Sequence, residues 1–75
     1  MLSIKNPLFE KLREVRANLA KENSIAAYMV FSDATLLEMA NEKPKNKDEM
    51  LNVSGVGEVK WERYGEAFVE VISKE

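Results

Sequence analysis

The chain opens with a stripe of hydrophobic residues at helical spacing. The members of the stripe, at intervals of four, three and four residues, are Leu8, Leu12, Val15 and Leu19. This spacing predicts a helix that runs to about Lys21. Asn6 is a good N-cap residue, and Pro7 suits the first helical position, where a backbone N–H would have no partner. The pattern places four charged residues on the opposite face, namely Lys11, Arg13, Glu14 and Arg16.

Residues 25–31 form an apolar run rich in strand-forming side chains. Periodicity alone would permit a strand here. No second segment of the chain offers a partner strand, and an unpaired strand would leave its backbone polar groups unsatisfied. We therefore expect a buried connection with one irregular helical turn.

Two short helices are predicted next. Ser32 and Asp33 should cap a helix that Pro44 ends. Asn46, followed three residues later by Glu49, resembles a capping box that opens a second helix. The apolar residues that these two helices offer to the core are Leu36, Leu37, Met39, Ala40, Met50, Leu51 and Val53.

Glycines mark the remaining boundaries. The Gly-Val-Gly stretch at residues 55–57 predicts a tight turn, since glycine tolerates positive φ values. A helix over residues 58–64 then offers Val59, Trp61 and Tyr64 to the core. Gly65 is expected to break or kink this helix before a last one that carries Ala67, Phe68, Val71 and Ile72. The predicted fold class is all-α, a compact bundle of four to five short helices.

Length and composition exclude several classes of function. The 75 residues form a single domain over 1–75, because a chain this short has no room for a second core. The absence of Cys and His excludes disulfide frameworks, thiol chemistry, zinc fingers and Ser-His triads. The only aspartates, Asp33 and Asp48, lie at predicted helix starts, where capping explains them better than a metal-dependent nuclease site. Catalysis by this segment alone is not expected, nor is a metal or cofactor.

Charge is distributed unevenly although the total is only −2. Residues 1–22 carry five basic side chains, Lys5 among them, against three acidic ones, and residues 43–47 add three lysines and no acid. Residues 58–75 run the other way, with three basic and five acidic side chains. Because salt screens charge beyond about 8–10 Å, attraction to phosphate depends on such local clusters. The alternative is that these lysines only keep a small domain soluble.

Two further features have both a functional and a structural interpretation. Tyr28 follows the basic helix closely and would give an unpaired base a ring on which to stack, or it is a core aromatic. The amides after residues 55–57 would attract phosphate at a helix start, but we favour a simple tight connection.

Three segments together resemble a known family. They are L-F-E-K-L-R over residues 8–13 with Arg16, then Y-M-V-F-S-D-A-T-L-L-E-M-A over residues 28–40, and M-L-N-V-S-G-V-G over residues 50–57 running on to K-W-E-R-Y-G at residues 60–65. The chain resembles the HRDC domain (helicase and ribonuclease D C-terminal), above all the version at the C-terminus of bacterial RecQ DNA helicases. The resemblance covers about residues 7–73.

This resemblance implies a five-helix bundle, excised from the C-terminus of a larger helicase that acts in DNA repair and recombination. It implies single-stranded or partly duplex DNA as the partner, with ATP and Mg²⁺ bound only by absent helicase domains. Tyr28 matches the position that relatives associate with single-strand binding, and Lys11, Arg13 and Arg16 match the family's basic first helix. Relatives often have proline before this tyrosine, whereas this chain has Ala27. The charge clusters add Lys21, Lys45 and Lys47 to the candidate binding residues.

The sequence therefore predicts a non-catalytic domain that binds single-stranded DNA weakly and without strong sequence preference. One alternative is a protein-interaction module of the helicase, which the acidic last helix favours. Another is the auxiliary domain of a ribonuclease D-like enzyme that processes RNA. We expect a monomer in the bacterial cytoplasm, associated with the nucleoid, and no membrane partner, because no apolar run approaches the roughly 20 residues of a membrane span.

Overall fold

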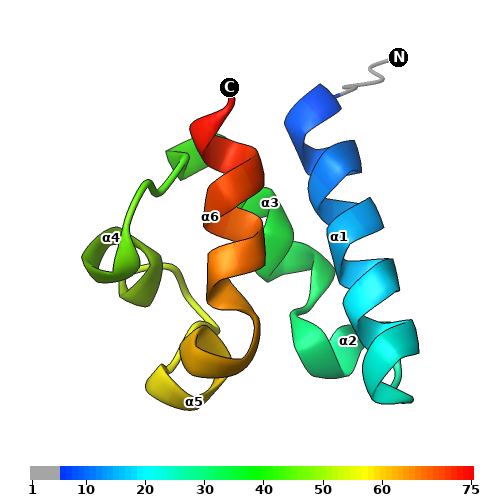
Figure 1. Ribbon diagram of the computed structural model, residues 1–75. Helices are drawn as coiled ribbons and strands as arrows, with labels where there is room; N and C mark the ends of the chain where they lie inside the picture. The colour runs from blue at the N-terminus through cyan, green and yellow to red at the C-terminus, as the bar shows by residue number, and fades with distance from the viewer. Residues whose placement is uncertain (1–5) are drawn as a thin grey trace.

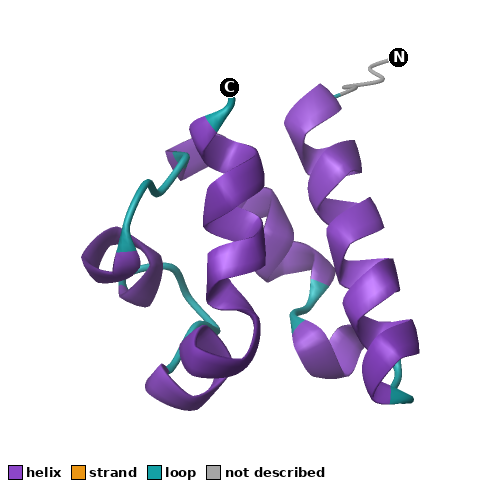
Figure 2. Ribbon diagram, in the orientation of Figure 1, coloured by secondary structure: helices purple, strands orange, loops and turns teal. Residues whose placement is uncertain are grey.

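Helices build residues 6–75, the part of the chain that the computed structural model describes, and those residues contain no strand (Figure 2). The elements are α1 (Pro7–Asn23), α2 (Ala27–Val30), α3 (Asp33–Glu42), α4 (Lys47–Leu51), α5 (Glu58–Lys60), a π-helical segment (Trp61–Gly65) and α6 (Glu66–Ser73). The last three follow one another without a gap, so the described chain has five helical segments. The prediction of an all-α bundle of four to five helices is confirmed.

Helix α1 begins and ends as its local sequence predicts. The Asn6 Oδ1 atom accepts hydrogen bonds from the amides of Leu8 and Phe9, at 3.1 and 3.2 Å. At the other end Ser24 adopts φ 57°, and its amide bonds back to the last turn. The helix runs to Asn23, two residues beyond the predicted end.

The buried face of α1 differs from the predicted stripe. Its buried residues are spaced four apart and are Leu8, Leu12, Arg16 and Ala20, whereas Val15 and Leu19 are only half-buried. The placement of Arg16 on the polar face was therefore wrong. Its long aliphatic stem can line a core while its guanidinium bonds to polar groups beyond that core.

The core contains residues from α1, α3, α4 and α6, and Phe31 is among its largest fully buried side chains. Helix α1 lies against α3 and α6, and α4 and α5 lie on the other side of α6 (Figure 1). The Phe31 ring meets the Phe68 ring edge to face, with centroids 5.2 Å apart, and meets the Tyr64 ring in the same way at 6.2 Å. Burial of a phenylalanine contributes about 1.5–3 kcal/mol, and each aromatic pair about 0.5–1.5 kcal/mol more.

Residues 25–31 form a connection with one helical turn, as predicted, but only part of it is buried. Ala26 is extended, α2 makes a single turn, and Phe31 returns to an extended conformation. Val30 and Phe31 enter the core, whereas Tyr28 and Met29 are exposed. A one-turn helix presents its residues in all directions, so a continuous apolar run can be buried on one side only.

The predicted caps of α3 and α4 are both present, but the Glu49 side chain bonds to a different amide from the one that a capping box uses. The Ser32 hydroxyl accepts the Thr35 amide at 3.2 Å, and Asn46 Oδ1 accepts the Glu49 amide at 2.9 Å. The Glu49 carboxylate accepts a hydrogen bond from the amide of Lys45, one residue before the cap, at 2.8 Å. Helix α3 ends at Glu42, two residues before Pro44.

Glycine has a distinct role at each of the last two boundaries. Gly55 adopts φ 92° in the predicted turn, and a Cβ there would lie 2.4 Å from the Thr35 hydroxyl oxygen. Gly65 was predicted to break or kink the helix; it does not break it but ends a π-helical turn with helical φ and ψ angles. Its missing Cβ leaves room for the Trp61 ring, whose Cε3 atom would otherwise be 2.0 Å away. Val59, predicted to enter the core, is 63% exposed.

Candidate nucleic-acid interface

Tyr28 lies on the outer side of α2, with 72% of its surface exposed. The neighbouring Met29 is 47% exposed, so the two form a small exposed apolar surface next to the end of α1 (Figure 1). A base can stack only on an aromatic ring whose face is open to solvent. The exposure of Tyr28 meets that requirement, and the buried alternative for this ring is wrong.

Arg16 ties the segment that carries Tyr28 to α1. Its Nη1 atom donates a hydrogen bond to the Phe31 carbonyl oxygen at 2.9 Å, and its Nη2 atom lies 2.7 Å from Asp33 Oδ1. Hydrogen bonds with an ionised partner are stronger than neutral ones. The guanidinium therefore joins α1 to the end of α2 and the start of α3, and it is engaged within the protein rather than free for phosphate.

Lys11 and Arg13 both have carboxylate neighbours. Lys11 Nζ lies 2.8 Å from Glu75 Oε2, and Arg13 Nη1 lies 3.6 Å from Glu10 Oε1. The hydrogen bond from Lys11, with a smaller contribution from the charge of Lys43, holds the pKa of Glu75 below its ordinary value. Exposed pairs of this kind contribute only about 0–1 kcal/mol, so a phosphate can compete for either cation.

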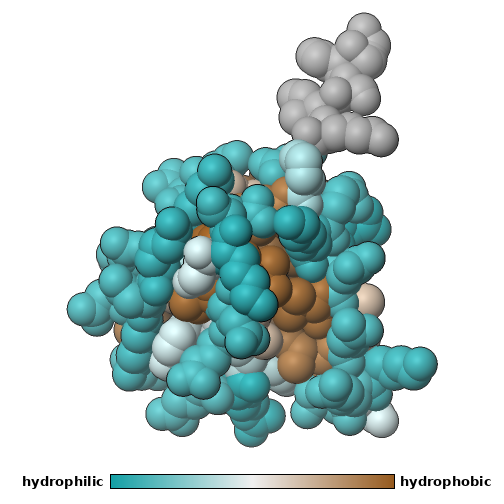
Figure 3. Space-filling view, turned by 45° about the horizontal axis from the view of Figure 1, so that its top comes forward, coloured by the Kyte–Doolittle hydropathy of each residue, from teal (hydrophilic) through white to brown (hydrophobic). Residues whose placement is uncertain are grey.

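The Lys11–Glu75 pair stands at the rim of a groove between α1 and α6. The groove has a volume of about 360 Å³, and Val15 and Val71 are among its lining residues. In Figure 3 a hydrophobic strip is visible between the hydrophilic side chains of the face that it shows. This groove lies beside Lys11, and Tyr28 is not among its lining residues.

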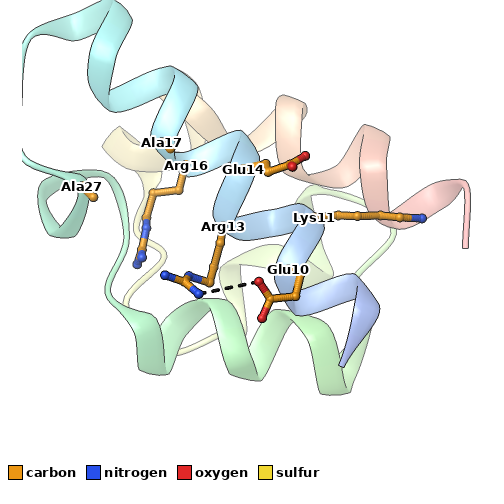
Figure 4. Close-up of a pocket in the computed structure, with 7 residues that line it drawn as sticks. All are labelled: Glu10, Lys11, Arg13, Glu14, Arg16, Ala17 and Ala27. Atoms are coloured by element: carbon orange, nitrogen blue, oxygen red, sulfur yellow. Dashed lines mark ion pairs between the residues drawn. The ribbon is translucent and has the colours of Figure 1, made fainter. Parts of the chain in front are cut away.

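An open pocket on the flank of α1 brings several predicted residues together. It has a volume of about 510 Å³ and is lined by Glu10, Lys11, Arg13, Glu14, Arg16, Ala17 and Ala27. Figure 4 shows Arg13 and Arg16 on the same side of α1, with Glu10 facing Arg13. Three cations and two carboxylates share the pocket, so this flank is mixed in charge. Ala27 connects it directly to the helical turn that bears Tyr28.

The other predicted cations among residues 6–75 lie in two different places. Lys21 is exposed in the last turn of α1, with no carboxylate within 4 Å among residues 6–75. Lys45 and Lys47 lie at the start of α4, on the opposite side of the molecule from α1 (Figure 1), and Lys47 Nζ pairs with Glu58 Oε1 at 3.3 Å. They are not brought together with Tyr28. Lys5 lies outside the described residues.

One cation near α2 was missed by the sequence analysis. Lys60 Nζ lies 5.8 Å from the centroid of the Phe31 ring. Phe31 is the residue directly after α2, the turn that carries Tyr28. The charge clusters of the sequence do not include Lys60, because the proximity of residues 29 positions apart depends on how α5 packs. In residues 6–75 no group of His, Cys, Asp and Glu is arranged to hold a metal ion, and no helix there is long and apolar enough to span a membrane.

Comparisons with known proteins bear on the family and the fold of the chain. The family model of the HRDC domain matches residues 5–72. The chain is 48% identical over 65 residues to the ATP-dependent DNA helicase RecQ of Bacillus subtilis, and 46% identical over 67 residues to that of Pasteurella multocida. These matches cover 87% and 89% of the chain but only 11% of each helicase. Among solved structures, HRDC domain 3 of D. radiodurans RecQ is similar at a TM-score of 0.86 and 40% identity, covering 89% of this chain and 88% of that one.

Proposed function

Since this chain is an HRDC domain of the RecQ type, we propose that it is an auxiliary domain through which a DNA helicase holds single-stranded or partly duplex DNA. Binding is weak and largely independent of sequence. ATP hydrolysis, with its Mg²⁺, belongs to helicase domains outside this chain, which spans about a tenth (11%) of the length of its curated relatives. The domain acts as a monomer in the bacterial cytoplasm, on the DNA of the nucleoid.

The exposed ring of Tyr28 is the observation that carries this proposal. A large aromatic side chain that is 72% exposed contributes little to the core. The Arg16 hydrogen bond to Phe31 holds the backbone three residues further on, so the ring is presented from an ordered turn. Stacking of one base on such a ring contributes about 1–3 kcal/mol and tolerates any base.

Phosphate contacts come from cations around α1 and α2. Lys21 is unpaired among the described residues, Lys11 has an exposed ion pair, and Arg13 has an exposed ion pair and a cation–π contact with Phe9 at 5.9 Å. If two to four phosphates are engaged, a slope of about −0.7 per phosphate gives a log–log salt dependence between roughly −1.4 and −2.8. Arg16 acts mainly as a positioning residue, because its guanidinium is buried and bonded.

Titration of labelled oligo-dT at two salt concentrations tests the proposal. Tyr28→Ala should weaken binding about fivefold to a hundredfold, from the loss of one stacked base, and should leave the fold intact. Met29→Ala is the matched control, since Met29 is exposed on the same turn and has no ring. Equal affinity of the parent and Tyr28→Ala at low salt would show that stacking is not part of binding.

A second candidate function, contact with protein, is favoured by the surface of α6. Trp61 lines an open groove of about 550 Å³ together with Glu66, Ala67, Val69 and Glu70. An aromatic ring that shares a groove with two carboxylates suits a basic side chain of a protein, and the carboxylates repel phosphate. If oligo-dT shows no salt-sensitive binding at any protein concentration, this contact becomes the better account. The curated relatives compared above are named as DNA helicases. The RNA-processing alternative is tested by comparing the affinity for RNA with that for DNA of equal length, because only RNA offers a 2′-hydroxyl.

A further inference from the structure

Lys60 differs from the other cations of the described residues because its ammonium group contacts the ring of Phe31, the core residue directly after α2. Among residues 6–75 it has no carboxylate within ion-pair distance. Two acidic residues are near Lys60 in the sequence. Glu58 is already paired with Lys47, and Glu62, two residues after Lys60, makes no ion pair with it. Within the described part of the chain, the positive charge of Lys60 is therefore not paired with a carboxylate.

The packing of Phe31 explains where this charge emerges. Lys60, Tyr64 and Phe68 are spaced four residues apart on one continuous helical segment, and all three approach the Phe31 ring. Tyr64 and Phe68 are buried, whereas Lys60 at the start of the segment is half-buried. Its stem covers the edge of the core, and its ammonium lies where the core meets solvent.

Lys60 contacts Phe31, and Tyr28 lies on the helical turn that directly precedes Phe31. Phe31 is three residues from Tyr28, a separation of at most about 11 Å along the chain, and Lys60 Nζ is 5.8 Å from the Phe31 ring centroid. Both α2 and α5 lie at the end of the molecule where α1 terminates (Figure 1). Arg16 from α1 and Lys60 from α5 thus approach Phe31 from two different helices, one at its carbonyl and one at its ring.

We propose that Lys60 is a phosphate-binding residue that extends the DNA path from α1 across α2 onto α5. The inference rests on the proposed function, because it assumes that a strand lies on Tyr28. A cation–π contact leaves the ammonium able to donate hydrogen bonds to phosphate. Residues 58–75, which carry more acidic than basic side chains, thereby supply one cation to the binding surface.

Lys60→Met tests this role, because methionine keeps an apolar stem against Phe31 and removes the charge. Affinity for oligo-dT at low salt should fall about three- to fivefold, and the salt slope should become shallower by about 0.7. Lys74→Met is the matched control, since Lys74 is an exposed lysine at the far end of the same helical segment. It should change neither quantity.

The outcomes separate this inference from the proposed function. If Lys60→Met binds like the parent while Tyr28→Ala binds less tightly, Lys60 is not a contact and the stacking site remains. If the two lysine variants lose affinity equally, the effect is one of total charge and the inference fails. If neither Lys60→Met nor Tyr28→Ala changes binding, both proposals fail. If Lys60→Met does not fold, NMR of the parent protein replaces this variant. The side-chain signal of Lys60 must shift on addition of oligo-dT if Lys60 contacts the DNA, and an unchanged signal overturns the inference.

Discussion

The guanidinium of Arg16 donates a 2.9 Å hydrogen bond to the carbonyl of Phe31. This contact joins the middle of α1 to the residue that ends α2, and the ring of the same phenylalanine packs on Tyr64 and Phe68. The exposed turn that bears Tyr28 is therefore attached to the core at its C-terminal end by both backbone and side chain.

Arg16→Ala should destabilise the fold by about 2 kcal/mol. The substitution leaves the Phe31 carbonyl without its charged donor, and a lost hydrogen bond of that kind costs about 1.5–3 kcal/mol. Asp33→Asn should cost less, because the Asp33 side chain is 76% exposed and water can replace its partner. Urea denaturation of both variants measures the difference, and equal losses would show that the bond to Phe31 is not the main contribution.

Gly65→Ala should destabilise the protein by about 1–3 kcal/mol, although alanine is ordinarily better than glycine in a helix. The new Cβ would overlap the Trp61 ring at 2.0 Å. Gly57→Ala is the control, because nothing lies within 4 Å of a Cβ at that position and its φ is −103°. Thermal unfolding should separate the two variants clearly, and a Gly65→Ala protein as stable as the parent would contradict the packing described for Trp61.

The carboxyl of Glu75 should titrate below its ordinary pKa of 4.5 because it accepts a hydrogen bond from Lys11. A lowered pKa in the folded state stabilises the fold at pH values above the unfolded pKa. That contribution disappears as the pH falls through the folded pKa. Lys11→Met should return the pKa toward 4.5, as followed by NMR of the Glu75 Cδ carbon, whereas Lys21→Met should not.

Removal of the same carboxylate should improve DNA binding. In the parent protein the ammonium of Lys11 lies 2.8 Å from Glu75 Oε2. Glu75→Gln removes the negative charge of this partner and so frees the ammonium. We expect oligo-dT to bind about threefold more tightly, because Lys11 no longer has to leave a carboxylate partner to contact a phosphate. An unchanged affinity would exclude Lys11 from the phosphate contacts.

Local patterns predicted much of this fold. The caps at Asn6, Ser32 and Asn46 depend on residues at most three positions away, so they could be read directly from the sequence. The burial of Arg16 could not, because it depends on a carbonyl 15 residues further along the chain. The exposure of Val59 likewise follows from how α5 packs.

The candidate site was less predictable than the fold. The orientation of Tyr28 was open, because a one-turn helix is too short for hydrophobic periodicity to show which residues face outward. Charge clustering in the sequence grouped Lys45 and Lys47 with the first helix, but helix packing places them on the opposite side of the molecule. The same packing brings Lys60 next to Phe31, a proximity that no local pattern signals.

The most direct test of the central claim is an NMR titration of the two tyrosine rings with oligo-dT. Tyr28 is 72% exposed and Tyr64 only 7%, so the second ring is an internal control. Stacking on a thymine should move the Tyr28 ring protons upfield in a saturable way and leave those of Tyr64 unchanged. An abasic oligonucleotide of the same length, which keeps the phosphates, should not produce the shift. Saturable binding of oligo-dT without any shift of Tyr28 would contradict the account.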